Sequence, residues 1–370
     1  MIRFCTRCTV SSMRPRITFD ADGVCSACRY AERQRAGIDW AARLDELQAL
    51  LARSRRLTGY DVIVPCSGGK DSALVAHKLK HQWRMTPLCT TWSPFQYTKI
   101  GWENFQNFVH SGFDVLTAFP NGLIHRKLAR LAFEFKGDAW EPFTFGQLCY
   151  PMNMAVRFNV PLVFFGENGE AIYSGDMTAA DKRSYDYDDW DRVYLKGVGF
   201  DRLLKIGVEL GAITSDEVRQ ACEFYRLPAR ETLDALGVQF TWWSYFNPWH
   251  PQSNYFYATE NTGFRANPER SEGTYSKYAS LDDKLDGFHF YFAYLKFGIG
   301  RCVSDAAHEV RDGDLERDEG MALVRKYDGE FPARNYGLFK DYLCIDDEQF
   351  QRVAERYTAQ HAKAPADRAA

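Results

Sequence analysis

The chain has 370 residues and a formal net charge of -3, from 46 Lys and Arg and 49 Asp and Glu residues. The length allows two or three domains with a large buried core, whereas the near-neutral charge gives the whole chain no attraction to polyanions such as nucleic acids or anionic membranes. Ten cysteines in 370 residues are far fewer than a secreted disulfide scaffold contains.

The N-terminal residues contain no apolar segment of the kind that directs export, because charges recur at Arg7 and Arg14. The longest charge-free stretch, 235–259, is long enough to span a membrane but contains polar and helix-breaking residues such as Asn247 and Pro248. We therefore expect a soluble cytoplasmic protein that contacts no membrane. In that compartment, paired cysteines hold metal more often than they form disulfides.

Four cysteines crowd the first 28 residues, as Cys5-x2-Cys8 and Cys25-x2-Cys28, with sixteen residues between the two pairs. This spacing is typical of a structural zinc site, in which each pair supplies two thiolates to a tetrahedron. Two disulfides or four unliganded thiols are the alternatives. A redox role is disfavoured because we expect neither pair to follow a strand and open a helix. We predict a module whose folding depends on zinc.

Apolar residues recur at helical spacing from Asp39 to Leu57, which predicts a helix that connects this module to the rest of the chain. The first 60 residues carry eleven Arg, no Lys and six acidic residues, a formal charge of +5, so the remainder carries -8. An acidic and aromatic stretch at 176–192 contributes to that negative charge. We interpret it as a surface insertion and assign it no role.

Short apolar runs then alternate with helix-like stretches, and the runs cover 60–66, 87–92, 113–118 and 161–165. This alternation predicts the βαβ units of an α/β fold with a doubly wound parallel sheet. After residue 197 the pattern is mostly helical, with helices expected at 201–210, 215–224, 281–297, 303–310, 315–327 and 346–357. A tail at 359–370, rich in Ala and in charge, is expected to be flexible.

One loop in this alternation carries the chemistry of phosphate binding. It has the sequence Ser67-Gly68-Gly69-Lys70-Asp71-Ser72, follows a predicted buried strand and opens a predicted helix, so free backbone N–H groups can face an anion. The glycines let the backbone approach phosphate oxygens, Lys70 adds a positive charge, and the serine hydroxyls add donors. The glycine spacing is not that of a Walker A loop. An ordinary turn is the alternative.

This loop resembles that of the PP-loop ATP pyrophosphatase superfamily. Members hold the β and γ phosphates of ATP in it while a substrate oxygen attacks the α phosphate. The resemblance implies a fold similar to the adenine nucleotide alpha hydrolases and makes Asp71 a Mg²⁺ ligand. The expected parts are a four-Cys zinc-binding module at 1–35, a connecting helix at 36–58, the ATP pyrophosphatase domain at 59–245, a mostly helical region that completes the substrate site at 246–358, and the tail at 359–370.

Four further segments narrow the resemblance, and they lie at 17–25, 142–147, 166–168 and 296–301. With the loop, they resemble the N-acetyl sugar amidotransferases of bacterial lipopolysaccharide and O-antigen synthesis, over about residues 3 to 345. The resemblance implies an enzyme that adenylates the acetamido group of a nucleotide-linked sugar, with a UDP-linked acetamido uronic acid as the expected substrate. Ammonia then replaces the oxygen to give an acetamidino group, and AMP and pyrophosphate are released.

Residues at two other predicted strand ends should meet the same crevice, because ligands of doubly wound sheets bind at the carboxyl ends of the strands. Thr90, Thr91 and Trp92 end the second strand and, by the resemblance, flank adenine; packing of Trp92 is the alternative. Gly166 and Glu167 end a later strand, where the Glu167 carboxylate would join Asp71 on Mg²⁺ or contact the substrate, with a simple turn as the alternative.

Two cations bracket a glycine-rich turn at 298–300. Lys296 and Arg301 could approach the departing pyrophosphate and offset its growing charge, so we predict a catalytic role for them beside Lys70 and Asp71. A helix C-cap followed by a solvated arginine is the alternative. Cys149 is a candidate nucleophile, but a buried structural thiol is favoured because no histidine lies near it in the sequence.

The chain has neither a Gly-x-Cys-x-Gly segment nor a cysteine at position 2, so we expect ammonia from a separate glutaminase subunit, which the resemblance also implies. A tRNA-thiolating enzyme is the first alternative, disfavoured by the net charge but kept open by the arginine-rich first 60 residues. An inactive nucleotide-binding scaffold is the second. The aromatic stretch 242–257 either walls a sugar pocket or packs in the core.

Overall fold

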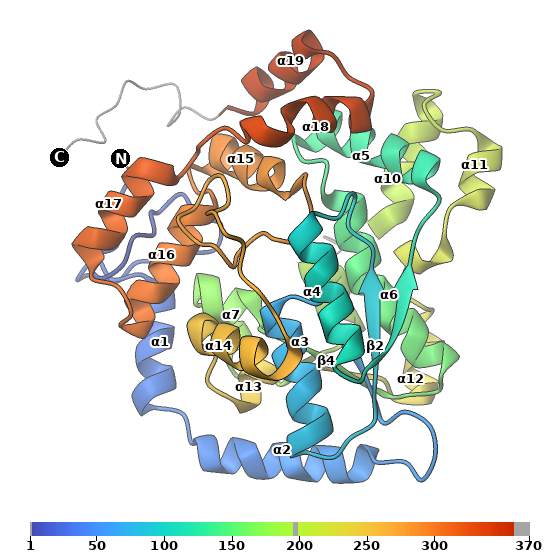
Figure 1. The fold of residues 1–370 in the computed structure, drawn as a ribbon, viewed down its shortest axis with the longest axis vertical. Coiled ribbons are helices and arrows are strands. Elements are labelled where there is room, and N and C mark those ends of the chain that lie inside the picture. Colours follow the sequence, from blue (N-terminus) through green and yellow to red (C-terminus); the bar gives the residue numbers. More distant parts are fainter. Residues whose placement is uncertain (1, 195–198, 359–370) are drawn as a thin grey trace.

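A computed structural model describes residues 2–194 and 199–358, and the predicted tail at 359–370 lies outside these ranges. Six strands form one sheet (Figure 1). They are β1 (Val62–Pro65), β2 (Pro87–Trp92), β3 (Asp114–Ala118), β4 (Leu162–Phe165), β5 (Ser184–Tyr185) and β6 (Gln239–Trp242). All neighbouring pairs are parallel except β5 and β6, which are antiparallel. This arrangement confirms the predicted α/β class and a mostly parallel sheet.

The strand order is β3-β2-β1-β4-β6-β5. From β1 the chain moves outward through β2 to β3, and it then returns to the other side of β1 to form β4. Connections therefore leave β1 and β4 toward opposite edges of the sheet. A crevice opens between the carboxyl ends of two such strands, and ligands of open α/β sheets bind there.

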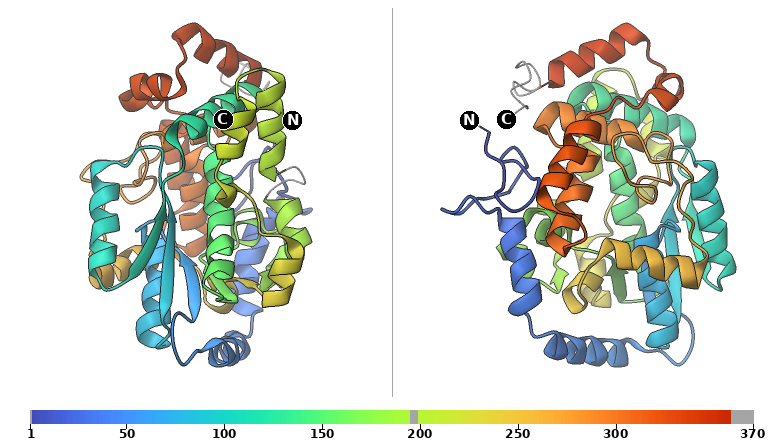
Figure 2. Two further views of the ribbon diagram at one scale, coloured as in Figure 1. Left: turned by 90° about the vertical axis from the view of Figure 1, so that its right-hand side faces the viewer. Right: turned by 60° about the vertical axis from the view of Figure 1, so that its left-hand side comes forward.

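Helices cover both faces of the sheet and extend beyond its carboxyl ends (Figure 2). Those up to residue 194 are α1 (Ser26–Ala36), α2 (Trp40–Ser54), α3 (Lys70–His77), α4 (Lys99–His110), α5 (Gly122–Lys136), α6 (Glu141–Arg157), α7 (Gly169–Ser174), α8 (Met177–Ala180) and α9 (Tyr187–Val193). Those from residue 199 onward are α10 (Gly199–Glu209), α11 (Ser215–Gln220), α12 (Arg230–Leu236), α13 (Trp243–Phe246), α14 (Pro251–Thr262), α15 (Asp286–Phe297), α16 (Arg301–Asp312), α17 (Arg317–Tyr327), α18 (Tyr336–Leu343) and α19 (Asp347–Tyr357).

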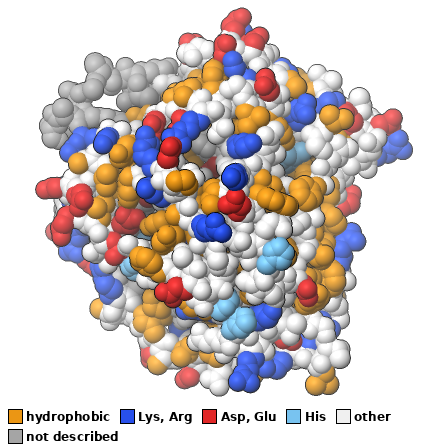
Figure 3. Space-filling view, viewed as in Figure 1, with side chains coloured by type: hydrophobic (Ala, Val, Ile, Leu, Met, Phe, Trp, Pro, Cys, Tyr) orange, Lys and Arg blue, Asp and Glu red, His pale blue; other side chains and the backbone are white. Residues whose placement is uncertain are grey.

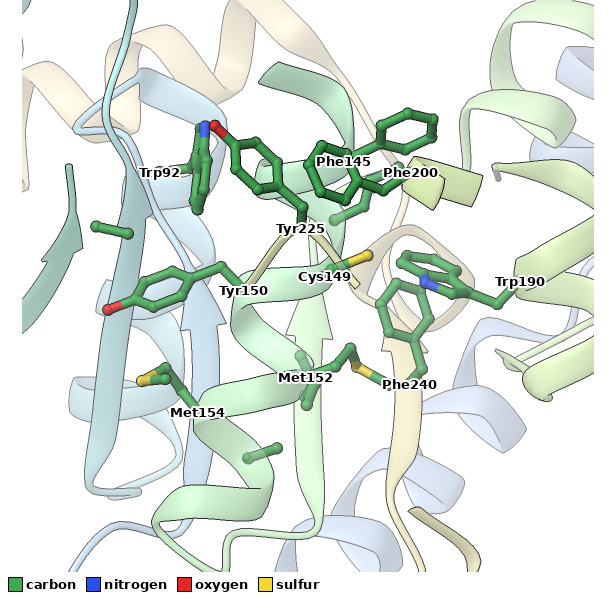
Figure 4. Close-up of a cluster of buried hydrophobic side chains, with 14 of the residues drawn as sticks. Trp92, Phe145, Cys149, Tyr150, Met152, Met154, Trp190, Phe200, Tyr225 and Phe240 are labelled. Carbon is green, nitrogen blue, oxygen red and sulfur yellow. The ribbon is translucent and has the colours of Figure 1, made fainter. Parts of the chain in front are cut away.

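Alternation along the central strand divides the main core in two. Ile63 of β1 packs in the core beneath α5, α6 and α10, whereas its neighbours Val62 and Val64 pack in the core beneath α2, α3 and α14. Figure 4 shows part of the first core, in which Trp92, Tyr150 and Tyr225 pack together. Because both faces of the sheet are covered, the central strands β1 and β4 consist of apolar residues, as in other parallel sheets.

Two smaller hydrophobic cores involve the N-terminal cysteine module and the helices after residue 285. The helices α15, α18 and α19 pack on α5 through a cluster rich in phenylalanine. The N-terminal module packs on α16 and α17, and Figure 2 shows its irregular chain beside these two helices. None of the helices in the described parts of the chain combines the length and the apolar character that a membrane span requires.

Three predictions about elements need correction. The helix predicted at 281–297 begins only at Asp286, and the one predicted at 215–224 ends at Gln220. The stretch 176–192 is not a surface insertion, because it contributes the edge strand β5 and most of α9. Within it Trp190 is buried, with its ring centroid 3.9 Å from that of Phe240.

Candidate functional site

A cavity of about 420 Å³ opens at the carboxyl ends of β1, β2 and β4. Its remaining walls come from α6 and from the C-terminal region, including Tyr278 and Asp282. The predicted site residues that line it are Ser67, Gly69, Lys70, Asp71, Ser72, Thr90, Thr91, Trp92, Gly166, Glu167 and Arg301. Two predicted residues, Gly68 and Lys296, are not among its lining residues.

The 67–72 loop joins β1 to α3 and faces this cavity. Gly69 is the N-cap of α3, so the unpaired N–H groups of the first helical turn lie at the cavity. Gly68 has a φ of +84°, and a Cβ at this position would meet Phe105 Cα at 2.6 Å. Gly68 therefore allows the loop to pass close to α4, while its neighbours form the cavity wall.

Lys70, which is buried, and Asp71, which is partly exposed, form an ion pair at the start of α3. The Lys70 side chain is only 9% exposed, and its Nζ donates to Asp71 Oδ2. The other carboxylate oxygen, Oδ1, accepts a hydrogen bond from Asn254 Nδ2 at 2.8 Å. Asn254 lies on α14, and no role was predicted for it from the sequence. This amide orients the carboxylate and leaves the Lys70 ammonium at the cavity.

Glu167 follows β4 and shares the cavity with Asp71. Burial, together with the negative charge of Asp71, raises the pKa of Glu167 to about 7, although Lys70 acts in the opposite direction. Its Oε1 accepts a hydrogen bond from the Tyr173 hydroxyl at 3.1 Å. The negative charge of Asp71 thus disfavours ionisation of Glu167. A divalent cation such as Mg²⁺ prefers oxygen ligands, and its binding to both carboxylates would remove this repulsion.

Three further carboxyl groups that were not predicted from the sequence line the cavity, those of Asp282, Asp283 and Asp286. Asp282 lies against the 67–72 loop, where it forms a side-chain hydrogen bond with Ser67. Burial and the charges of Asp286 and Asp71 raise the pKa of Asp282 to about 6. Burial raises the pKa of Asp283 to about 8, and its carboxylate accepts from the backbone N–H of Leu285 at 2.8 Å.

The segment around these carboxyl groups is irregular because Asp283 connects it to the loop that follows β2. In that loop, the backbone N–H of Phe95 donates to Asp283 Oδ2. One sequence signal could have revealed this segment. Acidic residues such as Asp282 and Asp283, placed just before a helical apolar pattern, mark the start of a helix better than its interior.

The residues at the end of β2 divide between the cavity and the core. The Thr91 hydroxyl donates to the carbonyl of Cys66, and the Trp92 ring packs 4.9 Å from the ring of Tyr225. Trp92 is 4% exposed, so most of its indole belongs to the core. Thr90 Oγ1 is buried and has no hydrogen-bond partner within residues 2–194 and 199–358. It therefore offers the cavity an unused polar group.

The two predicted cations of the 296–301 segment are separated. Arg301, the first residue of α16, lines the cavity, and its Nε donates to Asp305 Oδ1 at 3.0 Å. Lys296 lies in the last turn of α15, where its Nζ donates to the carbonyl of Lys136 at 3.2 Å. Gly298 caps α15, as the helix C-cap alternative required, but the Arg301 side chain is only partly exposed and pairs with Asp305.

The four N-terminal cysteines are reduced and buried, and they converge on one point. The Sγ atoms of Cys5 and Cys28 are 3.8 Å apart, those of Cys8 and Cys25 are 3.6 Å apart, and all four lie within 4.8 Å of one another. A tetrahedron with Zn–S bonds of about 2.3 Å has sulfur atoms about 3.8 Å apart, so the four thiols fit a metal ion such as zinc. They are too far apart for disulfides.

Neither pair of cysteines both follows a strand and opens a helix, which agrees with the prediction. Cys25 is the N-cap of α1, so the second pair does open a helix. It does not follow a strand of the sheet, since Cys25 takes part only in an isolated bridge with Phe19.

Two other candidates belong to the core. Cys149 is fully buried on α6, and burial raises the pKa of its thiol, which disfavours a nucleophilic thiolate. In the 242–257 stretch, Trp242, Trp243 and Trp249 are all buried in the hydrophobic cores, and none of them lines the cavity. The packing interpretation of this stretch is therefore the better one.

A known protein family matches the C-terminal part of the chain. The family described as "LPS biosynthesis protein WbpG-like, C-terminal domain" matches residues 272–366, about a quarter of the chain. No curated protein matches the chain. The matched segment includes the cavity residues Asp282, Asp286 and Arg301. The match fits a role in the synthesis of lipopolysaccharide sugars.

Proposed function

We propose that the chain is an ATP-dependent amidotransferase of lipopolysaccharide sugar synthesis, built on a PP-loop ATP pyrophosphatase domain. One observation carries the proposal: a single cavity is lined both by the 67–72 loop and by residues of the segment that matches a lipopolysaccharide biosynthesis family. The loop has the composition and helix-start geometry that suit phosphate, and the matched segment connects the site with sugar chemistry.

The proposed reaction converts the acetamido group of a nucleotide-linked sugar, such as a UDP-linked acetamido uronic acid, into an acetamidino group. An amide carbonyl is a poor electrophile, so its oxygen is first made a better leaving group. The amide oxygen attacks the α phosphate of ATP, pyrophosphate leaves, and the amide proton is lost. Ammonia then attacks the carbon of the adenylated imidate, and AMP leaves with the former amide oxygen.

The cavity residues suggest which groups would bind the phosphates, the metal ion and the departing pyrophosphate. The N-terminus of α3 and the Lys70 ammonium would bind the β and γ phosphates. Asp71 and Glu167 would hold Mg²⁺, which neutralises phosphate charge. Arg301 lies where it could stabilise the departing pyrophosphate. The predicted catalytic role of Lys296 gains no support from the cavity, because its side chain contacts Lys136 and is not among the lining residues.

Ammonia is proposed to come from a separate glutaminase subunit, and the reaction to take place in the cytoplasm.

A tRNA-thiolating function receives less support. Arginines of the first 60 residues form ion pairs within the chain, as Arg33 and Arg43 do with Asp181. On the face in Figure 3, basic and acidic side chains are interspersed, unlike a surface that follows a phosphate backbone.

A direct test incubates the purified chain with ATP, Mg²⁺, ammonium and a panel of acetamido sugar nucleotides. We expect release of AMP and pyrophosphate, and a sugar product lighter by the difference between O and NH in the mass spectrum. Lys70→Ala should abolish both, whereas Lys99→Ala, which removes an exposed lysine from α4, should not. Release of ADP, or AMP release that depends on tRNA instead of a sugar nucleotide, would overturn the proposal.

A further inference from the structure

Arg311 presents a buried positive charge that the proposed reaction does not use. It lies in the last turn of α16 and is 6% exposed. Its Nη1 is 3.9 Å from Cys8 Sγ. Within the described residues its guanidinium forms no ion pair with a carboxylate, and the adjacent Asp312 carboxylate instead lies 3.3 Å from His308 Nε2. A buried charge of this kind is strongly unfavourable unless an opposite charge compensates it.

The four-Cys cluster can supply that opposite charge. Four thiolates on one divalent zinc ion carry a net charge of -2. Two backbone N–H groups already point at one of the sulfurs, since those of Arg7 and Cys25 lie 3.4 Å and 3.3 Å from Cys5 Sγ. Such donors favour a thiolate over a thiol.

The charged side chains that line a neighbouring cavity are net positive. A second cavity, of about 370 Å³, is lined by residues of the cysteine module and by the segment 310–317, which runs from the end of α16 to the start of α17. The ionisable side chains that line it, apart from Cys28, are Arg7, Arg35, Arg311, Arg317, Glu32 and Glu316. Four arginines and two glutamates give this lining a net positive formal charge, opposite in sign to that of a metal–thiolate centre.

The module is also attached along the length of α16. Thr9 Oγ1 donates to the carbonyl of Val303 at 3.3 Å, and Arg14 Nη1 is 3.4 Å from Ser304 Oγ. At the other end of the helix, Arg35 Nη1 donates to the carbonyl of Arg311 at 2.6 Å. The first residue of this helix is Arg301, which lines the larger cavity.

We propose that Arg311 is the counter-cation of a zinc centre formed by Cys5, Cys8, Cys25 and Cys28, and that this pairing holds α16, and with it Arg301, in position. Arg311 is thus a positioning residue: it touches a metal ligand and acts on the cavity through the helix. The proposal does not require the amidotransferase reaction, so each can fail without the other.

The first experiment measures zinc retention by competition with a chromogenic chelator. Arg311→Gln removes the charge, Arg311→Lys keeps it, and Arg325→Gln removes an exposed arginine from α17 as a matched control. We expect zinc affinity to fall about 10- to 100-fold in Arg311→Gln, to fall much less in Arg311→Lys, and to stay unchanged in Arg325→Gln. Parental affinity in a folded Arg311→Gln protein, or equal losses in the Lys and Gln variants, would overturn the proposal.

The second experiment needs no substitution and therefore stands even where a variant does not fold. Hydrogen exchange is compared between the zinc-loaded and chelator-treated parent protein. We expect the amides of α16 to exchange faster after zinc removal, while those of α10, which packs in a different core, keep their rate. Unchanged exchange in α16 would contradict the anchoring role of the metal centre.

Discussion

Gly146 of α6 lies directly against the indole ring of Trp92. A Cβ at Gly146 would be 2.0 Å from Trp92 Cε2, well inside contact distance. This close approach lets α6 cross the end of β2, where Phe143 and Gln147 from the same helix line the cavity. A residue without a side chain at position 146 is therefore needed both for the packing of the core and for the position of the cavity wall formed by α6.

Gly146→Ala should destabilise the protein by about 1–3 kcal/mol, because the indole or the helix must move to admit the methyl group. Gly337→Ala is the matched control, since Gly337 also lies within a helix but has open space around its Cβ position. That variant should be more stable by about 0.5–1 kcal/mol. Urea unfolding followed by tryptophan fluorescence measures both changes, and equal stability of the two variants would contradict this account of Gly146.

The strands β1 to β4 were predictable because their signal is local, whereas β5 and β6 were not predicted. A run of apolar residues bounded by polar ones marks a strand buried on both faces, and β2 has the predicted bounds, 87–92. The loop after β1 was also predictable, since its glycines and charges are consecutive in the sequence. These segments need no information from distant parts of the chain.

The features that were missed depend on contacts between distant residues. Asn254 meets Asp71 across 183 positions, and nothing near Asn254 in the sequence indicates this. Leu281 and Leu285 continue the apolar spacing of α15, so the helix was extended over Asp282, although contacts with the loop after β2 hold the segment in an irregular conformation. Trp190 lies among acidic residues, yet it packs on Phe240.

Asp282→Asn tests the charge balance of the larger cavity. The Asp282 carboxyl lies beside the 67–72 loop and would repel a phosphate bound there unless a cation or a proton intervenes. We expect the variant to bind pyrophosphate several-fold more tightly than the parent without Mg²⁺, and to lose that advantage when Mg²⁺ is added. Calorimetric titration measures the affinities, with the exposed Asp216→Asn as the control. Weaker binding by Asp282→Asn in the absence of Mg²⁺ would contradict the prediction.

The raised pKa of Glu167 predicts a pH-dependent stability of the metal-free protein. Burial and the charge of Asp71 raise this pKa to about 7, so between the pKa values of the unfolded and folded states the folded protein binds more protons. Stability should therefore fall as the pH rises from about 5 to about 8. Glu167→Gln should melt at a higher temperature than the parent near the upper limit and change less with pH.

The control for this series is Glu209→Gln, which neutralises an exposed glutamate on α10 and should leave the pH profile unchanged. Thermal melts across the pH range provide the measurement. A parent protein that becomes more stable toward alkaline pH, or a Glu167→Gln variant with the parental profile, would show that the Glu167 carboxyl is not held in its protonated form by the fold.

Gly175 fixes the docking of the cysteine module on the sheet domain. It ends α7 with a φ of +65°, and a Cβ there would meet the backbone of Ser26 at 2.1 Å, where α1 begins. Gly175→Ala should therefore suffer two penalties: the backbone strain of about 1–2 kcal/mol for a left-handed residue, and a clash that separates α1 from α7. We expect faster proteolytic cleavage within residues 2–36 in addition to lower stability.

Gly237→Ala separates these two effects. Gly237 ends α12 with the same φ of +65° but has no atoms near its Cβ position, so this variant should show the strain alone and keep the N-terminal module protected. Limited proteolysis of both variants, read by mass spectrometry, distinguishes the cases. If the two variants are cleaved equally, the contact between α7 and α1 does not hold the module. If only Gly175→Ala is cleaved faster, the cysteine module is held by the contact between Gly175 and Ser26 in addition to its packing on α16.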